Sequence, residues 1–318
     1  MRSQALRADL LMLLTAAIWG SALVAQSVGM QAIGPFLYSG LRFALGALML
    51  LPLLWWRSDY RSTNGARTAL PLLNRSLLLG GALMGLALAV GINLQQVGLQ
   101  FTSVTNSGFI TGLYVIIVPL LGLLLGHRAG LGTWLGASLA VLGMFLLSVG
   151  EGFTVASGDW LQLAGAFVWG VHVLLVGALA SRHDPISLAF VQFAVCALLS
   201  LALALLLEPV ELAAISQAGP ALLYGGIVAV GIGYTLQVVA QKHAIASHAA
   251  LILSLEAVFA ALAGALLLSE TLQPRGYLGC ALMFAGMLLA QLWPKKLADI
   301  QTFEKHEKTQ TTEKVQNT

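Results

Sequence analysis

Long apolar segments separated by short polar connections follow one another along most of the chain. Ten of these segments have roughly 20 residues, the length that a helix needs to cross a hydrocarbon core about 30 Å thick. They cover residues 10–29, 35–55, 77–98, 103–125, 131–150, 159–180, 186–207, 220–241, 247–268 and 276–293. The pattern predicts an all-α integral membrane protein with ten transmembrane helices.

Charged residues are scarce, which supports a membrane protein. The 318 residues include 13 acidic and 16 basic side chains, or 9% charged, where a soluble domain has about 25%. A soluble enzyme would lack its charged shell, and a net charge of +3 is too small for a nucleic-acid binder. We expect the lipid bilayer as surroundings, no nucleic-acid partner, and a disordered cytoplasmic tail at 294–318.

The basic residues predict the orientation in the membrane. If the N-terminus is cytoplasmic, all Lys and Arg residues except Arg42 and Arg275 fall on the cytoplasmic side or in the tail. The positive-inside rule then places both termini in the cytoplasm. We expect a multi-pass protein of a bacterial-type inner (plasma) membrane.

Residues of the first half of the chain recur in the second half. Asp9, Trp19, Gly20, Pro35 and Phe43 recur 150 positions later as Asp159, Trp169, Gly170, Pro185 and Phe193, and later segments repeat at offsets of 141 to 143. Residues 9–150 and 159–293 are therefore predicted to be two copies of one five-helix unit. Because five is odd, the copies are inverted, an architecture of secondary transporters with a solute site at the repeat interface.

Several motifs together resemble the drug/metabolite transporter superfamily, in its ten-helix EamA-type branch. They are AIWGS at 17–21, LRF at 41–43, FTSVTN at 101–106, ALILSLEAVFA at 250–260 and LSE at 268–270. The resemblance covers 9–293 and implies two EamA-like repeats, 9–150 and 159–293, that export or exchange a small organic metabolite, amino acid or drug. The family often has Glu in both repeats, but here Glu256 is matched by Tyr114 and Glu270 by Arg128.

Two ionisable side chains lie deep within the predicted spans, where they are costly. Glu256 is either a proton-coupling carboxylate or a partner for a substrate amine, or else a hydrogen-bonded structural residue. Arg42 either snorkels towards the outer surface, which we favour, or contacts an anionic group of a substrate.

Polar and aromatic side chains on matched helix faces are candidates for a substrate cavity. Asn93, Gln96 and Gln100 share one face, and Tyr234, Gln237 and Gln241 repeat that face in the second copy. The members nearest the midplane are expected to line the cavity, together with the deep pair Trp19 and Trp169, and His172 and Tyr114; interhelical hydrogen bonding and core packing are the alternatives. The expected cavity residues are Trp19, Asn93, Gln96, Tyr114, Trp169, His172, Tyr234, Gln237 and Glu256.

Catalytic and nucleotide-binding motifs are missing from the sequence. It has no G-x-x-x-x-G-K-[ST], H-E-x-x-H or G-x-S-x-G. We expect no enzymatic activity, cofactor or metal, and we interpret Cys196 and Cys280 as packing residues. The expected partners are a small organic solute, lipid and, as a candidate coupling ion, the proton, for a monomer or a homodimer. A membrane receptor, an assembly factor and an intramembrane enzyme remain as alternatives.

Overall fold

A computed structural model describes residues 2–63, 74–127, 129–148, 156–269 and 274–293. Throughout these residues the regular structure is helical, and no strand occurs in them. The predictions that concern Arg128, Glu270 and the tail at 294–318 lie outside the described residues.

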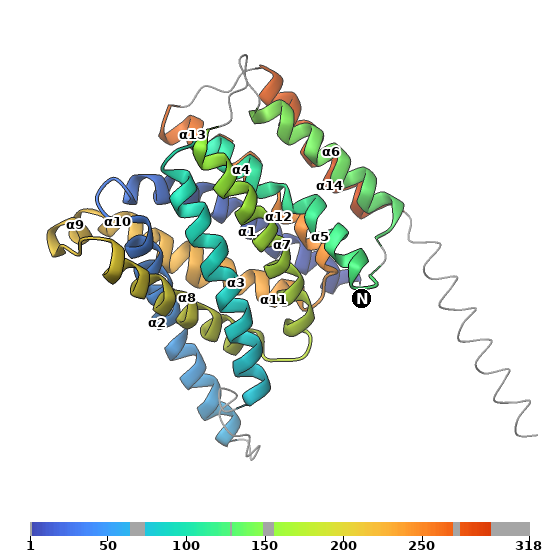
Figure 1. Cartoon of the computed structure of the whole chain (residues 1–318). Helices are drawn as coiled ribbons and strands as arrows, with labels where there is room; N and C mark the ends of the chain where they lie inside the picture. The colour runs from blue at the N-terminus through green and yellow to red at the C-terminus, as the bar shows by residue number, and fades with distance from the viewer. Residues whose placement is uncertain (1, 64–73, 128, 149–155, 270–273, 294–318) are drawn as a thin grey trace, which may run out of the picture.

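The helices follow one another with short connections, as Figure 1 shows. They are α1 (Arg2–Gly29), α2 (Pro35–Thr63), α3 (Arg75–Leu99), α4 (Val104–Gly112), α5 (Tyr114–Leu124), α6 (Leu131–Ser148), α7 (Ser157–Ala180), α8 (Pro185–Leu207), α9 (Leu212–Gln217), α10 (Gly219–Leu223), the π-helix η2 (Tyr224–Tyr234), α11 (Thr235–Gln241), α12 (Ala246–Leu253), α13 (Glu256–Leu267) and α14 (Pro274–Leu292).

Eight helical segments are long and apolar enough to cross a membrane. Three of these are composite: α4 with α5 over Val104–Leu124, α10 with η2 and α11 over Gly219–Gln241, and α12 with α13 over Ala246–Leu267. Leucines on their outward faces are largely exposed, for example Leu124 and Leu266, as lipid contact requires. The two remaining predicted spans correspond to α6 and α14, which are apolar but shorter over their described residues.

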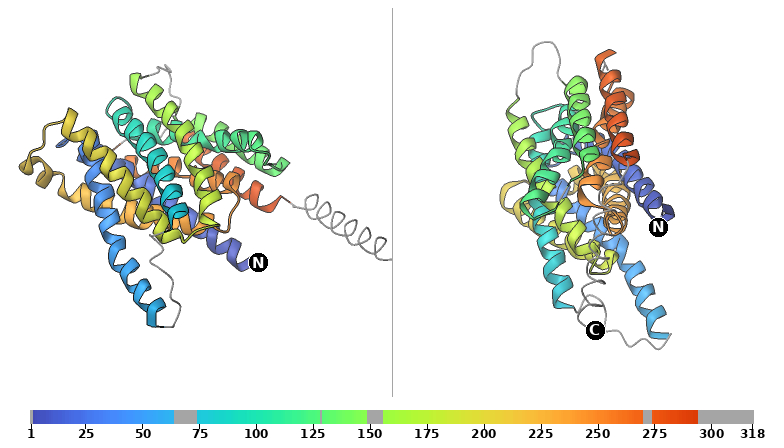
Figure 2. Two further views of the ribbon diagram at one scale, coloured as in Figure 1. Left: turned by 60° about the horizontal axis from the view of Figure 1, so that its bottom comes forward. Right: turned by 90° about the vertical axis from the view of Figure 1, so that its right-hand side faces the viewer.

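Helices α6 and α14 pack side by side at one edge of the molecule (Figures 1 and 2). Glycines bring their backbones together, because a Cβ on Gly136 would lie 2.6 Å from the carbonyl oxygen of Gly286. Gly143 meets the carbonyl oxygen of Gly279 in the same way. Positions that rise along α6 therefore meet positions that fall along α14, so the two helices are antiparallel.

The composite spans contain turns that depart from the α-helix. Between α4 and α5, the N–H of Leu113 donates to the carbonyl of Ile110, three residues back. Between α12 and α13, the N–H of Leu255 donates to Ile252 in the same way. Tightened turns of this kind inside a helix, like the π-helix η2, often mark functional positions. They place Tyr114 and Glu256 at the first positions of α5 and α13.

The start of α2 is capped by an acidic residue from the end of α8. Glu208 accepts hydrogen bonds from the backbone N–H groups of Phe36 and Leu37 at 2.8 and 2.7 Å. Gly34 permits this approach, because a Cβ there would overlap the Glu208 carboxyl group. The cap joins α2 to α8 and satisfies two N–H groups that a helix leaves unpaired.

Substituting Glu208→Ala is expected to lower the free energy of unfolding by about 1–2 kcal/mol, because two N–H groups at a helix start lose their acceptor. Thermal unfolding of the detergent-solubilised protein measures the change. Glu211→Ala is the matched control, since Glu211 is exposed and makes no side-chain cap. Equal melting temperatures for the two variants would contradict a stabilising role for the Glu208 cap.

Candidate functional site

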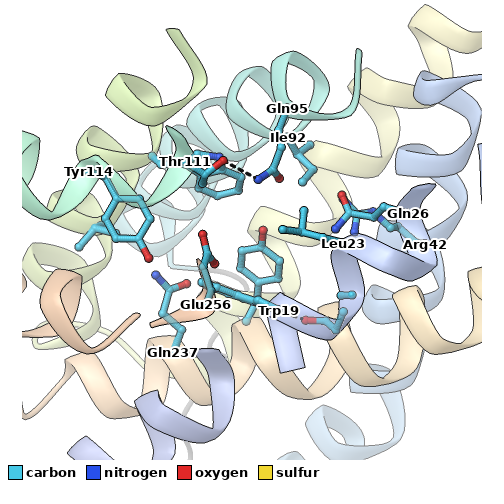
Figure 3. A pocket seen from close by; sticks show the side chains of 15 residues that line it. Trp19, Leu23, Gln26, Arg42, Ile92, Gln95, Thr111, Tyr114, Gln237 and Glu256 are labelled. Carbon is cyan, nitrogen blue, oxygen red and sulfur yellow. Dashed lines mark hydrogen bonds between the residues drawn. The ribbon is translucent and has the colours of Figure 1, made fainter. Parts of the chain in front are cut away.

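A small cavity lies at the centre of the helix bundle (Figure 3). Its volume accessible to the centre of a water molecule is about 30 Å³, enough for two or three waters. Side chains from both halves of the chain surround it: Trp19, Ala22, Leu23, Gln26, Arg42, Ile92, Gln95, Thr111, Tyr114, Trp169, Val173, Ala229, Tyr234, Gln237 and Glu256.

Glu256 enters the cavity from the tightened turn before α13. Its side chain is 5% exposed, and among the described residues Oε1 has no hydrogen-bond partner. In Figure 3 the carboxyl group points towards the same space as the ends of Tyr114 and Gln237. A carboxyl group at the first position of a helix is also favoured by the helix dipole.

Three aromatic side chains form one wall of the cavity. The ring centroids of Trp19 and Tyr234 are 4.4 Å apart, and Trp169 stacks on Tyr234 at 6.1 Å. Trp19 Nε1 donates to the carbonyl oxygen of Ala229 in η2 at 3.2 Å, which fixes its ring. Phe43 packs behind Tyr234 with centroids 5.6 Å apart. The arrangement presents apolar ring surface to whatever occupies the cavity.

Arg42 contributes a guanidinium group, and its side chain is only 1% exposed. It donates from Nη2 to Gln26 Oε1 at 3.3 Å and to Gln96 Oε1 at 3.4 Å. The snorkelling that we favoured from the sequence therefore does not occur. The side chain remains inside the bundle, where the neighbouring residues on α1 and α3 hold it.

A closed group of polar side chains joins α3, α4 and α7 beside the cavity. Gln95 Nε2 donates to Thr111 Oγ1 at 3.0 Å, and Thr111 Oγ1 donates to Gln162 Oε1 at 3.4 Å. Gln162 Nε2 donates in turn to the carbonyl oxygen of Gln95 at 2.9 Å. These bonds orient Gln95 and Thr111 at the cavity wall.

The structure brings together most of the residues singled out from the sequence. Those at the cavity are Trp19, Arg42, Tyr114, Trp169, Tyr234, Gln237 and Glu256. Gln96 lies behind the cavity wall and holds Arg42. Asn93 instead donates to Ser200 Oγ at 2.8 Å between α3 and α8, and His172 pairs with Gln192 at 2.9 Å.

Two polar residues at the cavity were not singled out from the sequence. Gln26 lies seven positions after Trp19 and shares its helix face, a spacing that was available from the sequence. Gln95 adjoins Gln96 in the chain, and the spacing rule for matched amide faces selected Gln96 instead. The cavity faces Ile92 and Gln95, about one residue further round α3.

Comparisons with known proteins agree with this arrangement. A model of the EamA-like transporter family matches residues 6–149 and again residues 156–292. An uncharacterized transporter of Archaeoglobus fulgidus is 30% identical over 300 residues, which cover 90% of this chain and 86% of the relative. The threonine/homoserine exporter RhtA of Escherichia coli is 26% identical over 311 residues, covering 93% and 94%.

A solved crystal structure shares the fold, with a TM-score of 0.73 at 20% identity over 91% of this chain and 98% of the other. The apolar helices make this chain a multi-pass membrane protein, and its relatives make it a transporter. With the family matched over both halves, the chain belongs to the EamA-like transporter family.

Proposed function

We propose that the chain is a secondary transporter that exports or exchanges a small organic solute by alternating access through the central cavity. The observation that carries this proposal is the cavity itself, which residues of both halves line beside the tightened turns before Tyr114 and Glu256. Irregular helices that meet at such a site are typical of secondary transporters. A metabolite, an amino acid or a drug is the expected solute, and the similarity to a threonine/homoserine exporter favours this range.

The proposal includes ten spans arranged as inverted copies, 9–150 and 159–293. Equivalent glycines with equivalent neighbours support it. A Cβ on Gly85 would meet the carbonyl oxygen of Gln192, and one on Gly226 would meet that of Arg42. The offsets between these positions are the 141 and 150 residues that relate the copies in the sequence.

The antiparallel pair α6 and α14 supports inversion. Gly136 matches Gly279 in the repeat, and Gly143 matches Gly286. Exchanging the two copies therefore converts the contact of Gly136 with Gly286 into the contact of Gly279 with Gly143, which is also present. A two-fold axis between the helices relates such contacts. We place the protein in the inner (plasma) membrane, with both termini in the cytoplasm.

The size of the cavity supports a closed intermediate of the transport cycle. A space for two or three waters is too small for an organic solute, so the walls must separate during transport. We further propose that Glu256 couples transport to protons, because its carboxyl group lies at the cavity with one oxygen unpartnered among the described residues.

Reconstitution of the full chain in liposomes tests transport. Counterflow with pooled amino acids and aromatic compounds is expected to reveal at least one transported solute. In a variant that lacks Cys196 and Cys280, a cysteine placed at Val173 or Ala22 is expected to react with an impermeant thiol reagent from each side of the membrane. The transported solute should slow the reaction on both sides.

A receptor or an assembly factor would give a different result, with no flux of any solute and labelling from one side at most. That combination would refute the transport proposal. Turnover of a pooled compound into a new product, without flux, would favour an intramembrane enzyme instead.

A further inference from the structure

The charge at Arg42 is not neutralised by the residues around it. A guanidinium group is permanently charged, and burying it away from water without a counter-ion is costly. Within the described part of the chain, neither Arg42 nor Glu256 forms an ion pair. The hydrogen-bond partners of Arg42 are neutral amides, and its other close neighbours are the rings of Tyr38 and Phe43.

The contacts that Arg42 does make are weak. Both of its hydrogen bonds start from Nη2, and at 3.3 and 3.4 Å they exceed the usual 2.9–3.0 Å. Nε is buried without a partner among the described residues, as is Nε2 of Gln96. Tyr38 and Phe43 lie 5.4 and 5.2 Å from the guanidinium carbon and cover it. The side chain is held in position, with donor capacity left unused.

We propose that Arg42, held by Gln26 and Gln96, is an anion subsite of the cavity that binds a carboxylate group of the solute. The inference rests on the proposed transport function and names the solute chemistry. A carboxylate matches the planar guanidinium in shape and balances its single charge. A phosphate would bring nearly two negative charges, and Arg42 is the one Arg or Lys among the cavity-lining residues in the described part of the chain.

The rest of the cavity indicates what accompanies the carboxylate. Trp19, Trp169 and Tyr234 offer ring surface for an apolar or aromatic body. The second half of the chain has no matching subsite, because Gln192 occupies the position equivalent to Arg42 and is fully buried against His172. The carboxylate is therefore bound on one side of the cavity, which gives the solute a fixed orientation.

The solute can be an amino acid or a simple organic acid, since both carry the group that Arg42 binds. The probes are benzoate, 3-phenylpropionate and the twenty standard amino acids, each paired with its carboxamide. Binding is measured first, as thermal stabilisation of the purified full-length protein in detergent, and then as inhibition of counterflow in liposomes. The binding measurement does not depend on transport.

Wild-type protein is expected to bind at least one carboxylate about ten- to hundredfold more tightly than the matching amide, the range for a charge-assisted pair. Binding of amino acids alone would identify an amino acid solute, and binding of the aromatic acids as well would identify organic acids. Arg42→Gln should lose the same factor for carboxylates and leave amide binding unchanged. Gln already occupies the equivalent position 192, and Arg42→Lys should retain part of the preference.

Arg75→Gln is the matched control, because it removes the same charge from an exposed position outside the cavity and should bind as the wild type does. The inference is overturned if amides bind as well as acids, if Arg42→Gln keeps wild-type affinity for carboxylates, or if no carboxylate binds. The comparison of acids with amides on the wild-type protein needs no variant to fold. Carboxylate binding without flux would refute the transport function and support the subsite.

Discussion

A Gly20→Ala variant is expected to lose nearly all transport and most of its folded yield. Gly20 lies where α1 crosses α13, and a Cβ there would lie 2.5 Å from Phe259 Cβ. It would also lie 2.6 Å from the carbonyl oxygen of Glu256 and 2.6 Å from the backbone nitrogen of Ala260. Backbone atoms cannot rotate away, so α1 would have to move off α13 beside the cavity.

Overpacking of this kind costs about 1–3 kcal/mol or more, and here it also displaces Glu256. Size-exclusion chromatography of the solubilised protein measures the yield, and counterflow in liposomes measures transport. Gly219→Ala is the control, because a Cβ at Gly219 meets nothing within 4 Å. Gly170→Ala should be milder and should recover with Ile117→Ala, since its nearest contact is Ile117 Cγ2 at 2.8 Å. A Gly20→Ala protein with wild-type yield and transport would show that this close approach is dispensable.

A Glu256→Gln variant is expected to retain counterflow and lose transport driven by a pH gradient. Gln has nearly the shape of the carboxyl group but cannot bind and release a proton. With one proton moved per solute, a gradient of one pH unit drives about tenfold accumulation, since one pH unit corresponds to 1.36 kcal/mol. The variant should equilibrate the solute without accumulating it.

Uptake into liposomes, with and without an imposed pH gradient, measures the difference. Asp9→Asn is the matched control, because Asp9 pairs with His248 at 3.2 Å, away from the cavity-lining residues. That variant should accumulate solute as the wild type does. If Glu256→Gln responds to the gradient as strongly as the wild type, Glu256 is not the coupling residue.

Much of the helical layout follows from the sequence, because apolar runs of roughly 20 residues leave few other folds open. Trp19 and Trp169 were assigned to the interior by their depth in the spans, and both reach the cavity wall. The helix irregularities were not predictable in this way. The tightened turns at Leu113 and Leu255 and the π-helix η2 alter the hydrogen-bond register without a Pro or a polar run to mark them.

The same irregularities explain why residue faces were harder to assign than residue depths. An ideal helix turns about 100° per residue, so an error of one residue exchanges Gln95 for Gln96 at the cavity wall. Asn93 shares the predicted polar face but finds Ser200 on α8, a partner that only the packing of α3 on α8 reveals. For Arg42, depth alone suggested an outward direction, whereas the amides of Gln26 and Gln96 turn the side chain inwards.

The small size of the cavity also bears on the electrical integrity of the membrane. A file of hydrogen-bonded water that crosses about 30 Å of hydrocarbon needs roughly ten molecules at about 2.8 Å spacing. The cavity has room for two or three, surrounded by tightly packed aromatic rings. Protons therefore have no continuous conduit through the protein in this conformation. A cell can keep many empty copies in its membrane without dissipating the gradients that it spends energy to maintain.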